Sequence, residues 1–213
     1  MFESNQKFKK TFNFVGFLIS ILGSVVFIVL VGLAHYYAHE VGFILRDWEL
    51  SELVLDSNKA KILFNTGIIF YGASLFIALI LMIDYFKDKK KQIIFIILVV
   101  ITCLSLVGVG AFSQDQFPEF HYIVALIFYL SGGVLTSYAS IYFLKYDKSI
   151  SIFYPIIGFL AVFMQIFNIA TRWFFGQAYT QRIAVCLSVL FFLLLSGKIL
   201  LRNEIVETKE NKN

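Results

Sequence analysis

The sequence predicts an all-α, polytopic membrane protein built as a bundle of six transmembrane helices. The 213 residues are 59% hydrophobic and only 15% charged, whereas soluble domains carry about 25% charged residues. A water-soluble fold of this size could not bury so much apolar surface in one core. The apolar residues also gather into six separate runs, each about as long as the ~20-residue helix that crosses a bilayer.

Each apolar run is predicted to form one membrane span. The first run follows several lysines, as in a secretory signal peptide, but it is longer than a signal's apolar region of about 7–15 residues. It also lacks a small-residue cleavage site, so we expect it to be retained. The six predicted spans are Phe12–Ala34, Ile62–Tyr85, Ile93–Phe112, Tyr122–Leu144, Ile150–Ala170 and Ile183–Leu201.

The distribution of positive charge predicts the orientation of the bundle. Of the 18 Lys and Arg residues, 13 lie on the side that carries the termini and the two short inner turns. Short loops rich in Lys and Arg stay in the cytoplasm, so both termini are predicted to be cytoplasmic, in the cell membrane of a prokaryote. Residues 1–202 then form one transmembrane domain, and residues 203–213 form a polar cytoplasmic tail.

The longest outer connection joins the first two spans. Within it, Val41 to Asp56 mixes large apolar residues with charged ones. This pattern predicts a short amphipathic segment on the outer ends of the helices. The alternative is an irregular loop whose apolar residues reach into the membrane interface.

The interior of the predicted spans carries no charge near mid-depth. Proton- and ion-coupled transporters keep an ionisable group there, so the pattern argues against those classes. Uncharged polar and small residues are frequent, and they favour close helix packing. Two amides near the outer ends, Asn65 and Asn168, are candidates to bind the polar part of a ligand.

All three histidines, His35, His39 and His121, fall on the outer side with several carboxylates. His35 and His39 are four residues apart, so a helix would place them on one face. Histidines with a carboxylate can hold zinc, and zinc can activate water for hydrolysis. The pattern is not specific, because the zinc-protease helix needs Glu where Tyr36 stands. The alternative is a belt of His and Tyr at the membrane interface.

Other outer loops add further candidate ligand-binding residues. Pro118 fixes a tight turn flanked by Glu119 and His121. Arg172 and Arg182 bracket the last outer loop. An arginine there can hold a phosphate headgroup or form a salt bridge between loops.

Two stretches carry a resemblance to a known family: Trp48-Glu-Leu-Ser-Glu-Leu continuing to Phe64–Gly72, and Gly108–His121 followed by Ser131-Gly-Gly. Across residues 48–140 the chain resembles a family of uncharacterised archaeal and bacterial six-helix membrane proteins. That family is similar in turn to the eukaryotic FRAG/DRAM/SFK-type membrane proteins. The resemblance implies a six-helix bundle in a membrane but no reaction. The recurring positions it implies are Ser51, Asn65, Gly67, Pro118, Glu119 and His121.

The sequence therefore favours a protein that binds or organises lipid, or a small amphipathic ligand, at the outer leaflet. The alternatives are a metal-dependent membrane hydrolase using the three histidines and a small transporter of neutral solutes. We expect membrane lipids as partners and no cofactor. The basic residues lie in short clusters between spans rather than along one face, which argues against nucleic-acid binding. An oligomer is possible, and the sequence does not decide its size.

Overall fold

The computed structural model describes residues 2–39, 50–55, 57–86, 88–146, 151–175 and 179–210. These residues form six α-helices and two short 3-10 helices, without a strand among them. All six α-helices are long and apolar enough to cross a membrane, which confirms the predicted six-helix bundle. The elements are α1 (Phe2–His39), η1 (Leu50–Val54), α2 (Asn58–Leu81), η2 (Ile83–Tyr85), α3 (Lys89–Ala111), α4 (Pro118–Tyr146), α5 (Phe153–Phe175) and α6 (Tyr179–Glu210).

Several helices extend beyond the apolar runs because polar residues at their ends continue or cap them. The Ser57 side chain caps α2 by accepting a hydrogen bond from the backbone N–H of Ala60, and Asp88 caps α3 through the N–H of Lys90. Such caps satisfy N–H groups that the first helical turn leaves free. At the other end of the chain, α6 continues to Glu210, so most of the predicted polar tail is helical.

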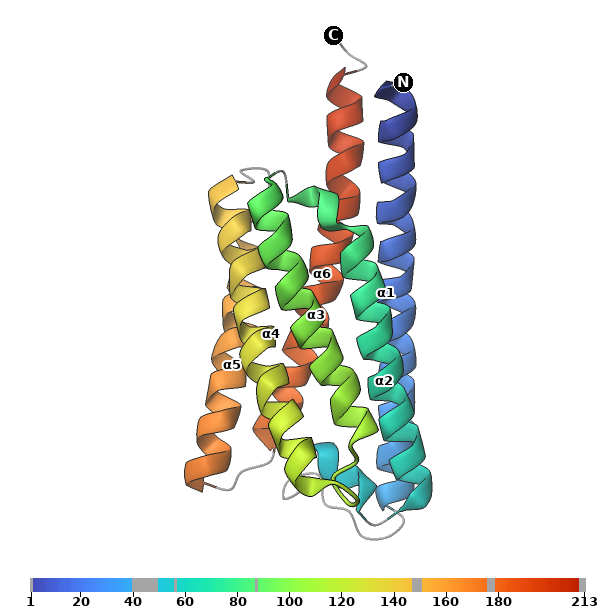
Figure 1. The fold of residues 1–213 in the computed structure, drawn as a ribbon, viewed down its shortest axis with the longest axis vertical. Coiled ribbons are helices and arrows are strands. Elements are labelled where there is room, and N and C mark those ends of the chain that lie inside the picture. The colour runs from blue at the N-terminus through green and yellow to red at the C-terminus, as the bar shows by residue number, and fades with distance from the viewer. Residues whose placement is uncertain are drawn as a thin grey trace.

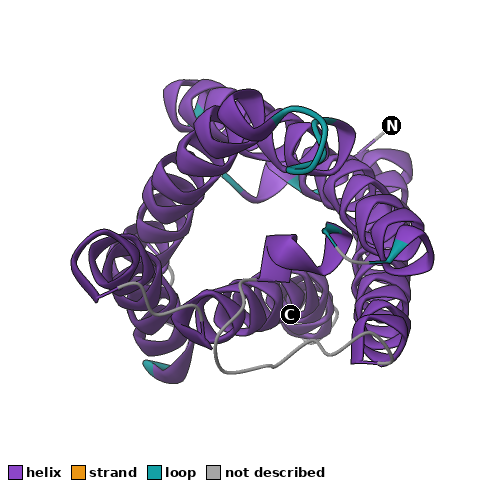
Figure 2. Ribbon diagram, turned by 90° about the horizontal axis from the view of Figure 1, so that it is seen from below, coloured by secondary structure: helices purple, strands orange, loops and turns teal. Residues whose placement is uncertain are grey.

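The six helices form a closed ring in sequence order. Each helix contacts its neighbours along the chain, and α6 returns to contact α1. Figure 2, a view along the helices, shows this ring. Few residues separate α2 from α3 and α4 from α5, and the helices of each pair are in contact, as is typical of helices joined by short connections.

The two ends of the ring differ. Figure 1 shows both termini at one end, which we call the terminal end. There an aromatic cluster fills the ring, with the Phe86 ring centroid 4.3 Å from that of Phe95 and 4.6 Å from that of Tyr142. At the opposite end, which we call the η1 end, η1 inserts with Leu50, Ser51, Leu53 and Val54 buried.

The predicted amphipathic outer segment is only partly within the described residues. Residues 41–49 and Asp56 lie outside them. The described part, Leu50–Val54, is buried against α2 and α1. Its apolar side chains are buried while Glu52 is half-buried, so this described part fits the predicted short amphipathic segment.

Small residues set the distance between neighbouring helices. A Cβ atom at Gly158 on α5 would lie 2.0 Å from Ser140 Oγ on α4, and one at Gly110 on α3 would lie 2.8 Å from the Asn65 carbonyl oxygen on α2. Deeper in the ring, Gln165 Nε2 on α5 donates to Ser188 Oγ on α6 at 2.8 Å. Membrane helices associate through such close approaches and inter-helix hydrogen bonds.

Candidate functional site

A cavity of about 500 Å³ lies at the η1 end, where α4 and α5 diverge in Figure 1. Its rim is formed by the exposed residues Tyr122, Ile123 and Leu126 of α4. These exposed apolar side chains lie on the membrane-facing surface of a spanning helix. The cavity thus opens to the lipid side of the bundle.

The inner wall of this cavity is more polar than its rim. It is lined by the buried residues Ser51 of η1, His121 of α4, Asn168 of α5 and Gln181 of α6. Four different elements therefore contribute polar side chains to this wall. The result is an amphipathic cavity, with apolar atoms toward the lipid and polar groups toward the centre of the ring.

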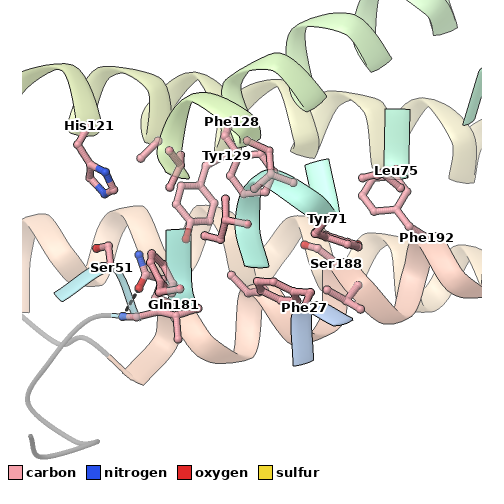
Figure 3. Close-up of a pocket in the computed structure, with 18 residues that line it drawn as sticks. Phe27, Ser51, Tyr71, Leu75, His121, Phe128, Tyr129, Gln181, Ser188 and Phe192 are labelled. Atoms are coloured by element: carbon pink, nitrogen blue, oxygen red, sulfur yellow. Dashed lines mark hydrogen bonds between the residues drawn. The ribbon is translucent and has the colours of Figure 1, made fainter. Parts of the chain in front are cut away.

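A second, narrower cavity of about 50 Å³ continues into the ring. It is almost entirely apolar, with Phe27, Phe64 and Leu75 among its walls. The two cavities share Ser51, Ala125, Tyr129, His121 and Gln181. Polar groups thus stand at the junction of two apolar spaces. Figure 3 shows the Ser51 hydroxyl, the His121 ring and the Gln181 amide directed into the same region.

Gln181 is fixed by the backbone of η1. Its Oε1 atom accepts a hydrogen bond from the N–H of Leu50. A backbone N–H can only donate, so the partner must be the amide oxygen, and the amide nitrogen faces away from Leu50. Figure 3 shows that nitrogen on the side of Ser51 and Tyr129.

His121 is held by the turn between α3 and α4. Its Nδ1 atom lies 2.9 Å from the carbonyl oxygen of Phe112, the residue after α3. A carbonyl only accepts, so Nδ1 carries the proton of this hydrogen bond. The ring also lies beside the Val109 carbonyl. His121 therefore satisfies carbonyl groups at the carboxyl end of α3 while one face of its ring lines the cavity.

Asn168 is oriented by the first turn of α6. Its Oδ1 atom accepts a hydrogen bond from Thr180 Oγ1 at 2.9 Å, and Thr180 also contacts Thr171 Oγ1 at 3.0 Å. Because the amide oxygen points toward α6, the amide nitrogen of Asn168 is left on the other side. Asn168 is 5% exposed and lines the larger cavity.

The turn at residues 112–117 closes this end of the bundle. Lys61 of α2 forms an ion pair with Asp115, and Ser113 donates a second hydrogen bond to the same carboxylate. Partial burial opposes the charged form, but the hydrogen bonds from Lys61 and Ser113 outweigh it and lower the pKa of Asp115. The turn that positions His121 is thus tied to α2 by a charged contact.

The other residues expected from the sequence lie elsewhere. Glu119 is exposed in the first turn of α4, and Asn65 is half-buried on α2, across the ring from α5. Arg182 lies close enough to His35 of α1 for their charges to interact. None of these four residues lines either cavity. The side chain of Arg172 lies outside the described part of the structure. Of the predicted ligand-binding residues, the cavity brings together His121 and Asn168.

The positions implied by the family resemblance divide in the same way. Ser51 and His121 line both cavities. Pro118 begins α4, where its missing N–H costs no helical hydrogen bond. Gly67 allows α2 to approach α1, because a Cβ atom there would lie 3.2 Å from Leu30 Cβ.

The three histidines do not form a metal site. Across the described ranges, which contain all three, no group of three or more His, Cys, Asp and Glu side chains could hold a metal ion. His35 Nδ1 bonds the Val31 carbonyl of its own helix at 2.8 Å, and His39 is exposed at the end of α1. The hydrolase alternative therefore gains no support from their arrangement.

Comparison of the chain with protein-family models, curated proteins and solved structures found no match. The function must be argued from the cavity itself.

Gln181 and Tyr129 are two polar residues of the cavity that the sequence analysis did not single out. The sixth predicted span begins at Ile183, but α6 begins at Tyr179, so Gln181 was assigned to a loop. Tyr129 was not distinguished from the other aromatic residues of its span. The spacing His121, Ala125, Tyr129 places all three on one helical face, and the small Ala125 leaves space between the two rings. This i, i+4, i+8 spacing is the sequence feature that could have placed Tyr129 beside His121 in the site.

Proposed function

We propose that this protein binds a lipid or a small amphipathic molecule through the cavity between α4, α5 and α6. One observation carries the proposal. The cavity of about 500 Å³ combines an exposed apolar rim with the buried polar residues Ser51, His121, Asn168 and Gln181. Its volume falls within the range of about 300–1,000 Å³ typical of small-molecule sites.

The polar groups at the cavity junction support a ligand of this kind. The Ser51 hydroxyl and the Gln181 amide nitrogen have no hydrogen-bond partner among the described residues. An unpaired polar group away from water costs several kcal/mol in a membrane. A bound headgroup at the junction would supply the missing partners while its apolar part occupies the rim.

The location favours the outer leaflet. The cavity is at the η1 end, opposite the termini in Figure 1. The excess of Lys and Arg on the terminal side favours a cytoplasmic position for the termini. With that orientation, the rim at Ile123 and Leu126 faces the outer half of the bilayer.

Native mass spectrometry of the protein after mild detergent extraction tests the proposal. We expect a lipid or amphipathic molecule to remain bound to the unchanged protein. Leu126→Trp should reduce its retention, because the larger side chain fills the rim of the cavity. Leu130→Trp is the matched control, since Leu130 is an exposed leucine one turn further along α4 and does not line the cavity.

Two results would overturn the proposal. One is a protein that retains no such ligand from native membranes and shows no thermal shift with any lipid added back. The other is equal retention by Leu126→Trp, Leu130→Trp and the unchanged protein, which would place the bound molecule outside this cavity.

A further inference from the structure

The hydrogen-bond donors of the cavity narrow the class of molecule that fits it. Gln181 is 9% exposed, and its amide oxygen is already engaged by the Leu50 N–H. The group left facing the cavity is the NH₂, which only donates. Asn168 repeats this arrangement, because its oxygen is engaged by Thr180. Both residues line the larger cavity, so its wall contains two buried amides whose oxygens are already engaged.

The Ser51 hydroxyl adds a third polar group at the same junction. Ser51 is 4% exposed and has no hydrogen-bond partner among the described residues. A hydroxyl can donate or accept, so it does not change the preference set by the amides. The three groups together require a ligand with at least one strong acceptor.

The cavity does not suit a charged acceptor. None of the described residues that line either cavity is Lys, Arg, Asp or Glu. Arg182 follows Gln181 directly but lies beside His35 and not in the lining. An anion such as a phosphate would find no Lys or Arg counter-charge among these described lining residues, and burying an unpaired anion is costly.

We propose that the preferred ligand is an uncharged acylated lipid, whose ester or amide carbonyl accepts hydrogen bonds from the Gln181 and Asn168 amides. This inference rests on the proposed lipid-binding function. A carbonyl oxygen has two lone pairs, so one such oxygen has the capacity to accept from both donors. The acyl chains leave past Ile123 and Leu126 into the membrane, where the rim is apolar. Diacylglycerols and ceramides have this chemistry, whereas ether lipids lack the carbonyl and phosphatidates add charge.

A series of three lipids, tested on the unchanged protein, separates the effect of the acyl carbonyl from the effect of headgroup charge. The delipidated full chain in detergent is offered dioleoylglycerol, its dioleyl-ether analogue and dioleoyl phosphatidate, and bound lipid is quantified by native mass spectrometry. We expect the diester to bind about tenfold more tightly than the diether, from two neutral hydrogen bonds. We expect the phosphatidate to bind more weakly than the diester.

Variants locate the source of the preference. Gln181→Met and Asn168→Leu each remove one donor, so the ratio of diester to diether affinity should fall about threefold or more in either. Gln116→Met in the exposed turn before α4 should leave the ratio unchanged. Because the readout is a ratio between two lipids, partial loss of folded protein does not alter it. Gln181→Met also removes the acceptor of the Leu50 N–H, so Asn168→Leu, which keeps that contact, is the deciding variant.

The outcomes distinguish the two proposals. Equal binding of diester and diether, or tightest binding of phosphatidate, overturns the uncharged-acyl inference and leaves lipid binding standing. An unchanged ratio in both variants also overturns the inference. Binding of none of the three lipids, with none retained from the membrane, overturns the proposed function and the inference with it.

Discussion

The side-chain oxygen of Gln181 accepts a hydrogen bond from the backbone N–H of Leu50, joining α6 to η1 across 131 positions of the chain. η1 otherwise packs on α2 and α1. The contact with Gln181 therefore also attaches η1 to α6, the helix that closes the ring next to α1. The same residue lines the cavity, so the support of η1 and the shape of the candidate site depend on one side chain.

Gln181→Leu should destabilise the η1 end. The substitution leaves the buried Leu50 N–H without its acceptor, and an unsatisfied buried donor costs about 1–3 kcal/mol. We expect a lower unfolding temperature in detergent and faster hydrogen exchange at the Leu50 amide. Gln116→Leu, in the exposed turn, should change stability by less than about 0.5 kcal/mol. Unchanged exchange at Leu50 would contradict the assigned hydrogen bond.

The Gly158–Ser140 contact gives a second prediction, about helix packing. Gly158→Ala places a Cβ atom 2.0 Å from Ser140 Oγ and 2.7 Å from Phe191 Cε2, so the Ser140 hydroxyl, the Phe191 ring or α5 itself must shift. Overpacking of this kind typically costs about 1–3 kcal/mol. The unfolding temperature of the purified protein should fall accordingly.

Gly32→Ala is the matched control for this substitution. A Cβ atom at Gly32 would meet nothing within 4 Å, and alanine favours a helix over glycine by up to about 1 kcal/mol. Its unfolding temperature should stay the same or rise. Adding Ser140→Gly to Gly158→Ala should recover part of the lost stability, because residues in contact are not additive. Equal losses from the two glycine substitutions would show that the helix crossing does not depend on Gly158.

The fold was predictable because the thickness of the bilayer fixes the length of the apolar run that can cross it. Which face of each helix points inward was not predictable in the same way. A membrane span is apolar toward lipid and toward its neighbours, so the alternation that marks the buried face of a soluble helix is weak. Asn65 and Asn168 look equivalent in sequence, yet only Asn168 lines the cavity.

The first residue of a helix was also hard to predict. The predicted start of the sixth span was too late, so Gln181 was left out of the predicted site. Polar residues at the membrane interface can belong to a loop or to the first helical turn. Thr180 and Gln181 belong to the first turn of α6, where they orient Asn168 and hold Leu50. His121 could be identified as an outer-face histidine, whereas Ser51 was marked only by a family resemblance that no family-model match supports. Both residues line the cavity.

The Lys61–Asp115 ion pair predicts a dependence of stability on pH. Hydrogen bonds to the Asp115 carboxylate lower its folded-state pKa below the ordinary value, which is about 3.9. A lowered pKa stabilises the folded state above the unfolded-state pKa, and this contribution is lost as pH falls through the folded-state value. The pair should contribute no more than about 1 kcal/mol, because it is near the surface.

Unfolding temperatures measured from pH 7 to pH 3 test this dependence. Asp115→Asn should lower stability at pH 7 and reduce the further loss on acidification below about pH 4. Glu119→Gln, a charge-removing control at an exposed position on the same end of the bundle, should keep the acid dependence of the unchanged protein. A parallel pH curve for Asp115→Asn would show that the ion pair contributes nothing.

The orientation of the bundle determines which leaflet the cavity opens to, and cysteine labelling can measure it. The distribution of Lys and Arg predicts that the η1 end is outside the cell. After Cys103 and Cys186, the two cysteines of the chain, are replaced by alanine, Gln116→Cys should react with a membrane-impermeant maleimide in intact cells.

Lys89→Cys provides the opposite probe, because Lys89 is exposed at the start of α3 on the terminal end. It should react only after the cells are permeabilised. The reverse pattern would put both termini outside, since they lie at the same end of the bundle as the start of α3 in Figure 1. The rim at Ile123 and Leu126 would then face the inner leaflet, and a bound lipid would have to come from there.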